Sequence, residues 1–331
     1  MMNIVYACDD NFAWLTGISI LSLYENNRDI QDLDVWLISD GISNKNKRLI
    51  EEMADGRGRK VTIVEKPELD LPDLSYDDRW SVSTFTRLYL ADILPKEIDK
   101  VLYVDGDTIV RGSIAPICET DPGDNVICGV RDCISRSYKK NIGLDEEDIY
   151  VNAGVIIMNL RELRKLDMSG VIETFVARYG RYITYPDQDL LNSVFRGRIG
   201  ELPPEFNVMT IATTYSRREI EILRRPTCYY PAEVLRQAAD DPVIVHFTTN
   251  MLTVRPWYSN ASHPFTGEFR HYMSMSPWAA RKLDRMVFRK KEHKVIKAVN
   301  MLPSAVSIRL LGILHTSVRP AVTKLKAKRR A

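Results

Sequence analysis

Two acidic residues, one position apart, end a short apolar segment in the first third of the chain. Asp105 and Asp107 follow the segment 100–104, whose β-branched and aromatic residues predict a buried strand. Residues i and i+2 of an extended chain point the same way, so both carboxylates leave the strand side by side. Carboxylates this close repel each other unless one is protonated or a cation lies between them. Gly106 lets the backbone bend or a ligand approach closely.

Three interpretations of this Asp-x-Asp pattern compete. The first is an ordinary turn rich in Asp and Gly at the end of a strand. The second is a phosphatase of the haloacid-dehalogenase type, whose first motif is similar and in which Asp105 would be the nucleophile. The third is a metal clamp for a sugar nucleotide, as in the Asp-x-Asp motif of many glycosyltransferases. The motif alone does not separate the last two interpretations.

The elements expected around this motif alternate between strand and helix. Strands are predicted at 4–8, 33–38 and 61–64, and helices at 12–24, from an N-cap at Ser43 to about 54, and at 84–94. This alternation implies an α/β fold with a mainly parallel sheet and helices on both faces. Ligands of such sheets bind at the carboxyl ends of the strands, where Asp9 and Asp105 fall.

Later segments bring more polar groups to element ends. Strands are predicted at 126–130, 155–158 and 243–247, and helices at 161–179 and 187–195. Asp132 follows the first of these strands, and His246 ends the last. Asp187 and Asp189 lie in the first turn of a helix, where acids suit the helix dipole, so a capping role stays open for either.

A divalent cation is one chemistry that unites these groups. A cation that holds a diphosphate takes carboxylate and phosphate oxygens in six-coordinate geometry. Asp105, Asp107 and His246 would supply such a set, and the imidazole favours manganese, with magnesium as the alternative. Taken alone, His246 is more readily interpreted as a satisfied core histidine at a strand end than as a metal ligand. Arg255 would neutralise phosphate oxygens, although an isolated arginine before Pro-Trp is commonly a surface residue.

Six short motifs occur in one order along the chain: 7–11 (Ala-Cys-Asp-Asp-Asn), 84–88 (Thr-Phe-Thr-Arg-Leu), 102–107 (Leu-Tyr-Val-Asp-Gly-Asp), 151–155 (Val-Asn-Ala-Gly-Val), 187–192 (Asp-Gln-Asp-Leu-Leu-Asn), and His246-Phe247 with 255–257 (Arg-Pro-Trp). In this order and spacing, about residues 1–260 resemble glycosyltransferase family 8, the family of bacterial lipooligosaccharide galactosyltransferases and glycogenin. The resemblance implies a GT-A fold and transfer of galactose or glucose from a UDP-hexose to a saccharide or glycolipid acceptor, with retention of anomeric configuration.

The resemblance also implies a role for each matching residue. The uridine would be held by Ala7, Asp9 and Asn11, and the donor contacted by Arg87. Manganese and the diphosphate would be bound by Asp105, Asp107 and His246, with Asp105 also near the ribose. The donor sugar would be surrounded by Asn152, Ala153, Asp187 and Gln188. One departure concerns the family's short Gly-x-x-Lys-Pro-Trp loop: the loop 248–254 is longer and has no Gly, and Arg255 replaces the Lys.

The residues expected to carry the transfer are Gln188, Asp132 and Asp189. Gln188 would lie near the anomeric carbon, but an amide oxygen is a weak base and a poor nucleophile. Either aspartate would serve as the nucleophile only within bonding reach of the sugar. We therefore expect an oxocarbenium-like transition state and front-face attack by the acceptor, with the departing phosphate taking the acceptor proton.

Two alternatives are weaker on the same residues. A haloacid-dehalogenase phosphatase has its Asp-x-Asp near the start of the domain and needs a later Lys and an acidic Gly-Asp motif, which the segment 187–189 does not match. A non-catalytic sugar-nucleotide-binding protein would be expected to lose a metal ligand, and the set is complete here.

The charge of the chain is unevenly distributed. The net charge is +2, yet residues 281–331 carry 15 Lys or Arg against two acids, so a strongly basic tail follows an acidic body. We expect a catalytic domain at 1–280 and an amphipathic tail at 281–331, which Pro303 splits into two short helical pieces. Such a segment suits an anionic membrane surface. Its apolar stripe argues against nucleic acid as the partner, and a solvated helix that closes the domain is the alternative.

The cysteines and the chain start indicate a cellular compartment. The five cysteines form no C-x-x-C pair, so neither a disulfide framework nor a zinc site is indicated, which fits a reducing compartment. The first ten residues have no basic segment and too short an apolar run for a signal peptide, and no spanning helix is predicted. We expect a cytoplasmic protein, peripheral on the inner face of the plasma membrane.

Overall fold

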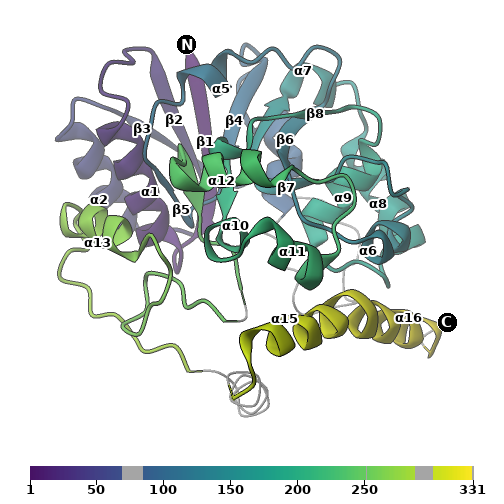
Figure 1. Cartoon of the computed structure of the whole chain (residues 1–331). Helices are drawn as coiled ribbons and strands as arrows, with labels where there is room; N and C mark the ends of the chain where they lie inside the picture. Colours follow the sequence, from purple (N-terminus) through teal and green to yellow (C-terminus); the bar gives the residue numbers. More distant parts are fainter. Residues whose placement is uncertain (69–84, 251, 288–300, 330–331) are drawn as a thin grey trace.

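A seven-stranded sheet forms the centre of the molecule (Figure 1), in a computed structural model that describes residues 1–68, 85–250, 252–287 and 301–329. Its strands are ordered β3-β2-β1-β4-β7-β6-β8. In chain order they are β1 (Met2–Asp9), β2 (Leu33–Asp40), β3 (Val61–Glu65), β4 (Lys100–Val104), β6 (Ile127–Arg131), β7 (Val151–Asn159) and β8 (Ile199–Glu201).

The sheet is mostly parallel, as the alternation of strands and helices predicts. β1 pairs in parallel with both β2 and β4, and β2–β3 and β6–β8 are also parallel. The exception is β7, which runs antiparallel to β4 and to β6. The start of β7 therefore lies beside the end of β4, and the Asp105 N–H donates to the Gly154 carbonyl at 2.7 Å.

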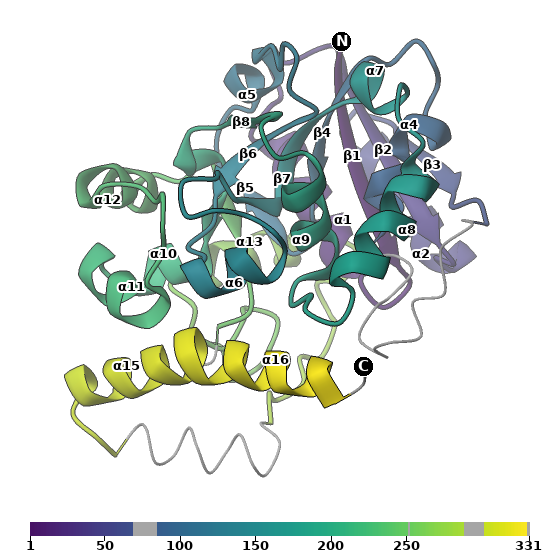
Figure 2. The same ribbon diagram turned by 90° about the vertical axis from the view of Figure 1, so that its right-hand side faces the viewer.

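Both faces of the sheet are buried under helices (Figures 1 and 2). Along β1, Ile4 and Tyr6 belong to one apolar core and Val5 to the other, because successive side chains of a strand point to opposite faces. The first core lies against α1 (Ala13–Glu25), α2 (Asn44–Asp55) and α13 (Thr266–Ser274). The second lies against α4 (Leu90–Ile93), α8 (Met168–Tyr179) and α9 (Pro186–Val194).

A second, three-stranded sheet brings distant segments to the carboxyl end of β4. It consists of β5 (Thr108–Val110), β10 (Ile244–His246) and β9 (Val208–Met209), in that order. β10 runs antiparallel to β5, with His246 opposite Thr108. This pairing places His246 next to Asp107, which immediately precedes β5.

Most expected elements are confirmed, and three are placed differently, the third being the helix predicted at 84–94. The helix predicted at 161–179 is instead two helices, α7 (Leu160–Leu163) and α8, because the side chain of Asp167 accepts from the Gly170 N–H and starts a new helix there. The strand predicted at 155–158 begins earlier, at Val151, so Asn152 and Gly154 lie within β7 rather than before it.

The remaining helices are short. Between 86 and 141 they are the 3₁₀ helix η1 (Thr86–Tyr89), α5 (Ala115–Glu119) and α6 (Arg136–Asn141). After β8 they are η2 (Pro204–Phe206), α10 (Thr210–Thr214), α11 (Arg217–Arg224) and α12 (Ala232–Asp240). η1 and α4 together replace the single helix predicted at 84–94, of which residue 84 lies outside the described residues.

The end of the chain forms one continuous helix that packs on the body. It comprises α15 (Ser304–Ile313), a π-helical turn η3 (Leu314–Val318) and α16 (Arg319–Arg329). This C-terminal helix lies beyond the ends of the parallel strands and next to α11 (Figures 1 and 2). Pro303 is its N-cap, and the helical piece expected before it falls mainly outside the described residues. In the described part of the chain, no helix is long and apolar enough to cross a membrane.

Candidate active site

Asp105, Asp107 and His246 come together at the carboxyl end of β4. Their ligand atoms all lie within 4.8 Å of one another. His246 Nε2 is 3.2 Å from an oxygen of Asp107 and 3.8 Å from an oxygen of Asp105. The other ring nitrogen, Nδ1, is 3.0 Å from Asn207 Oδ1. That bond holds the ring so that Nε2 faces the carboxylates, which is how histidine ligands are commonly oriented toward a metal ion.

The electrostatics of this cluster fit a divalent cation. Burial disfavours a charged imidazole, but the charge and hydrogen bond of Asp107 outweigh it, so the pKa of His246 is raised. Burial would also raise the pKa of Asp107, but His246 and Arg255 outweigh this and lower it. The two carboxylates thus stabilise positive charge next to them. Two carboxylates and one imidazole form a donor set that suits manganese or magnesium.

The position of Gly154 in β7 makes room for the cluster. A Cβ atom at this residue would lie 2.2 Å from His246 Cε1 and 2.7 Å from an oxygen of Asp105. Gly106 is similarly enclosed, because a Cβ there would lie 2.1 Å from Thr16 Oγ1. Both glycines are therefore required by close contacts around the two aspartates.

Arg87 is a buried cation that joins the cluster of Asp105, Asp107 and His246 to helix α9. It donates to Asp105 Oδ1 at 2.9 Å and to the Ala153 carbonyl at 2.5 Å, and its Nε lies 3.0 Å from Asp187 Oδ2. Its guanidinium also stacks over the ring of Tyr103, 4.3 Å from the centroid. Burial raises the pKa of Asp187, and Arg87 offsets this only in part. Arg87 therefore fixes Asp105 and Asp187 relative to each other.

Gln188 is held rigidly by hydrogen bonds from both ends of its amide. Its Oε1 accepts from Asn152 Nδ2 at 2.9 Å and from the Ala153 N–H at 3.1 Å. Its Nε2 donates to Asp132 Oδ2 at 2.9 Å, and Asp132 Oδ1 accepts from the Cys133 N–H at 2.7 Å. Asn207, which the sequence motifs do not point to, bridges this network to His246 by donating to Asn152 Oδ1 at 2.9 Å.

The structure places Asp189 away from the reacting region. One of its oxygens accepts from the Tyr150 hydroxyl at 2.6 Å, and the other accepts from the N–H groups of Thr184 and Tyr185 at 2.7 and 2.9 Å. The residue is 3% exposed, and it is not among the residues that line the cavity next to Gln188 and His246. Burial, only partly offset by these hydrogen bonds, raises the pKa of its carboxyl to about 6. Asp189 therefore stabilises the start of α9.

Whereas Arg87 pairs with Asp105, Arg255 lies next to Asp107. Its Nη1 is 3.8 Å from Asp107 Oδ2, and its guanidinium stacks on the Trp257 ring, 4.6 Å from the centroid. The stacking orients the guanidinium and leaves its donors directed at the cluster. That Arg255 replaces the family's Lys stays a prediction.

A cavity of about 290 Å³ opens beside the cluster. Five of its lining residues are predicted site residues: Asp107, Asp132, Asn152, Gln188 and His246. Arg224 and His315 also line it, and nothing in the sequence pattern singles them out. Ala7, Asp9 and Asn11 are not in the lining; they lie at the carboxyl end of β1, the strand next to β4, where Asp9 Oδ1 accepts from the Phe12 N–H at the start of α1.

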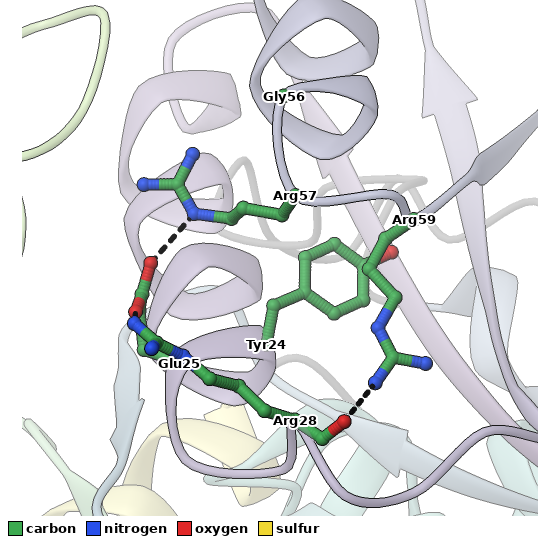
Figure 3. Close-up of a pocket in the computed structure, with 6 residues that line it drawn as sticks. All are labelled: Tyr24, Glu25, Arg28, Gly56, Arg57 and Arg59. Carbon is green, nitrogen blue, oxygen red and sulfur yellow. Dashed lines mark hydrogen bonds and ion pairs between the residues drawn. The ribbon is translucent and has the colours of Figure 1, made fainter.

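A larger hollow, of about 550 Å³, lies at the other end of the strands, between the end of α1 and the turn that leads into β3 (Figure 3). Its arginines are engaged in holding the end of α1: Arg57 Nε pairs with Glu25 at 2.7 Å, Arg28 pairs with the same carboxylate, and Arg59 donates to the Arg28 carbonyl at 3.2 Å. Among the described residues, no aspartate or histidine lines this hollow. Its contacts stabilise the fold, and the chemistry gathers at the carboxyl ends of the strands.

Comparison with known proteins decides between the two kinds of Asp-x-Asp site. The family model for glycosyl transferase family 8 matches residues 3–261. The chain belongs to glycosyl transferase family 8. This excludes the phosphatase alternative, and the chain is a retaining hexosyltransferase. Membership also implies a sugar-nucleotide donor, a divalent metal ion and a saccharide acceptor.

Relatives and solved structures agree with this assignment. The chain is 26% identical over 298 residues to a lipopolysaccharide 1,2-glucosyltransferase of Escherichia coli, covering 88% of this chain and 83% of that one. It is 25% identical over 281 residues to general stress protein A of Bacillus subtilis, covering 84% and 95%. The structure of the galactosyltransferase LgtC with donor and acceptor sugar analogues superposes on this chain with a TM-score of 0.69 at 23% identity. The match covers 88% of this chain and 99% of LgtC, so the two proteins share the GT-A fold.

Gly154→Ala is a direct test of the crowded metal cluster. We expect the added methyl group to displace His246 and Asp105 and to lower metal-dependent activity at least about 100-fold, because small displacements of reacting groups are costly. Calorimetric titration with Mn²⁺ should show correspondingly weaker binding. Gly267→Ala is the matched control, since nothing lies within 4 Å of a Cβ there. Unchanged Mn²⁺ binding in Gly154→Ala would contradict the assignment of the cluster.

Asp189→Asn separates a structural from a catalytic role. An amide has one acceptor oxygen where the carboxylate has two, so we expect a loss of about 1–3 kcal/mol in the free energy of unfolding. Activity per folded molecule should stay within a few-fold of native at a temperature where the variant is folded. Asp240→Asn is the control, because its side chain is 64% exposed. A large loss of activity without a loss of stability would return Asp189 to the catalytic set.

Proposed function

We propose that this enzyme transfers galactose or glucose from a UDP-hexose to the saccharide part of a bacterial cell-surface glycolipid, with manganese as the metal ion. The observation that carries the proposal is the cluster of Asp105, Asp107 and His246, whose ligand atoms lie within 4.8 Å of one another beside a cavity at the carboxyl edge of the sheet. Similarity to a lipopolysaccharide 1,2-glucosyltransferase supports the acceptor class.

The residues of the cluster would hold the donor diphosphate. A divalent ion bound by Asp105, Asp107 and His246 would supply Lewis-acid stabilisation of the charge that grows on the leaving diphosphate. Arg255, stacked on Trp257 and 3.8 Å from Asp107, adds a guanidinium on the same side. Because the guanidinium is already held in place before the reaction, its positive charge would stabilise the negative charge that develops on the leaving UDP. Magnesium would fit the same oxygen ligands, and the imidazole favours manganese.

The rest of the donor would lie along the carboxyl edge of the sheet. Ala7 and Asp9 belong to the end of β1, next to β4, and Asn11 follows it; these residues would hold the uridine. Arg87, with its ties to Asp105 and Asp187, would position the diphosphate and the sugar together. The donor hexose would be surrounded by Asn152, Ala153, Asp187 and Gln188.

The hydrogen bonds of Gln188 and Asp132 favour front-face transfer. Gln188 presents an amide whose oxygen already accepts from Asn152 and Ala153, so it is a poor nucleophile. Asp132 lines the cavity, but each of its oxygens accepts a hydrogen bond from the protein, which lowers its nucleophilicity. Asp189 is turned away. The acceptor hydroxyl would attack from the side that UDP leaves, giving its proton to the departing phosphate, and Gln188 and Asp132 would orient the sugar.

The C-terminal helix would bind the inner face of the membrane. One face packs on the body through Ile308 and Leu311, and the opposite face presents large apolar side chains that are 42 to 61% exposed: Val306, Leu310, Ile313, Leu314, Val318, Val322 and Leu325. A helix that is apolar on both faces needs a second apolar environment. Arg309 and Arg319 are exposed on it, and the sequence adds five Lys or Arg after residue 323, which suits an anionic bilayer.

The donor and metal assignments are tested together by UDP release from a panel of nucleotide sugars. We expect hydrolysis of one UDP-hexose with Mn²⁺, less with Mg²⁺ and none with a chelator. Asp107→Asn should lower the rate at least about 100-fold, because it weakens the hold on the leaving diphosphate. Asp240→Asn again serves as the control. A rate that the chelator does not change, or release from sugars of another nucleotide only, would contradict the proposal.

The membrane assignment is tested by substitutions on the exposed face of the C-terminal helix. The triple change Leu310→Ser, Leu314→Ser and Val318→Ser should lower binding to phosphatidylglycerol vesicles at least about tenfold, since each removes apolar area from the contact. UDP release should be unaffected. Met275→Ser is the control, because Met275 is 39% exposed but lies on the body. Unchanged sedimentation of the triple variant with vesicles would refute membrane binding through this face.

A further inference from the structure

The C-terminal helix forms one wall of the catalytic cavity. Asp107, Gln188 and His246 line the cavity on the side of the sheet, whereas Arg224 of α11 and His315 of the C-terminal helix line it farther from the strands. In both views this helix crosses the molecule below α11, beyond the ends of the parallel strands (Figures 1 and 2). The part of the cavity that the metal cluster does not occupy is therefore bounded by a segment from the end of the chain.

Specific contacts hold this helix in place. Gly312 lies against α11 so closely that a Cβ atom there would be 2.1 Å from the Ile222 carbonyl oxygen. Ile308 and Leu311 pack on Leu223 in a small apolar cluster. The Tyr138 hydroxyl donates to the His315 carbonyl at 3.2 Å. These contacts fix the position of the His315 ring at the cavity.

Arg224 is a half-buried cation without a carboxylate partner. In the described part of the chain, no carboxylate oxygen lies within 4.0 Å of its guanidinium, which contacts His315 Nε2 and the Tyr185 hydroxyl. The carboxylate whose charge acts on it is that of Asp132, and both oxygens of Asp132 already accept hydrogen bonds, from Gln188 and from the Cys133 N–H. Charged side chains that leave bulk water are normally paired, because an uncompensated charge is costly there.

His315 adds a hydrogen-bond donor beside this cation. Burial and the charges of Arg224 and Arg319 lower its pKa to about 3, so the ring is neutral. Arginine has no acceptor, so Nε2 must accept from Arg224 and Nδ1 must carry the proton. Nδ1 is buried and has no hydrogen-bond partner among the described residues. The pair therefore combines a guanidinium without a carboxylate partner and an imidazole N–H whose hydrogen-bonding capacity is unused, both on side chains that line the cavity.

We propose that Arg224 and His315 form an anion-binding subsite on the acceptor side of the cavity, which takes a phosphate or carboxylate group. This rests on the proposed function, because it assigns the second substrate of the same site. A guanidinium binds such groups with paired, charge-assisted hydrogen bonds. The anion belongs either to a charged sugar of the acceptor or to a lipid headgroup next to it, and the C-terminal helix completes the subsite.

The test compares a charged and a neutral sugar on the full-length enzyme. UDP release from the donor sugar is measured with Mn²⁺ while glucose 6-phosphate or methyl glucoside is added. We expect glucose 6-phosphate to change the rate at a concentration at least about tenfold lower than methyl glucoside does, a difference of about 1.4 kcal/mol. Arg224→Gln should abolish this preference, and His315→Ala should reduce it. Dihexanoyl phosphatidylglycerol is tested in parallel, and its displacement of glucose 6-phosphate would assign the lipid headgroup.

Gly312→Ala tests the contribution of the helix without changing a group in the cavity. It should move the helix away from α11, abolish the preference for the charged sugar and leave UDP release without added sugar unchanged. Gly267→Ala should keep the preference. Equal effects of the charged and neutral sugars on the native enzyme, or a preference that survives in Arg224→Gln, would overturn the proposal. Absence of UDP release from the native enzyme would instead count against the proposed function.

Discussion

The repulsion between two carboxylates at the end of β4 is the constraint around which this molecule is built. Asp105 and Asp107 are side by side and partly removed from water, where an uncompensated charge costs several kcal/mol. Positive or protonatable groups therefore surround them: Arg87 on Asp105, and His246 and Arg255 on Asp107. These partners come from segments far apart in the sequence. Their convergence leaves the place between the two carboxylates suited to a divalent cation.

The topology of the two sheets explains how these segments meet. β7 is antiparallel to β4, so its first residues, not its last, lie beside Asp105. β10 is antiparallel to β5, so its last residue, His246, lies beside the residue that precedes β5. Both reversals bring polar residues to the same edge at which the parallel strands end. These residues can approach one another only because residue 154 is glycine: a side chain there would clash with His246 and Asp105.

Sequence patterns predict the parts of this arrangement that local chemistry determines. Strand and helix periods predicted the order of elements and a mainly parallel sheet. The order of the motifs predicted the family and the convergence of Asp105, Asp107 and His246. The prediction of a single helix at 161–179 was wrong, because the helical spacing of apolar residues does not show that Asp167 starts a new helix. The role of Asn207 and the contact between Arg224 and His315 were not predicted, because no sequence motif links the elements that they join. Arg224 and His315 are 91 positions apart.

On the proposed function, the C-terminal helix would place the acceptor relative to the membrane. Its inner face carries His315 and packs on α11, and its outer face carries the exposed apolar side chains. A helix with its side chains is about 10 Å across, so an enzyme bound to the bilayer through the outer face would hold its cavity about one helix diameter from the surface. A sugar attached to a lipid headgroup reaches that height without leaving the membrane. Membrane binding and acceptor binding would then share one structural element, whereas the donor site depends only on the edge of the sheet.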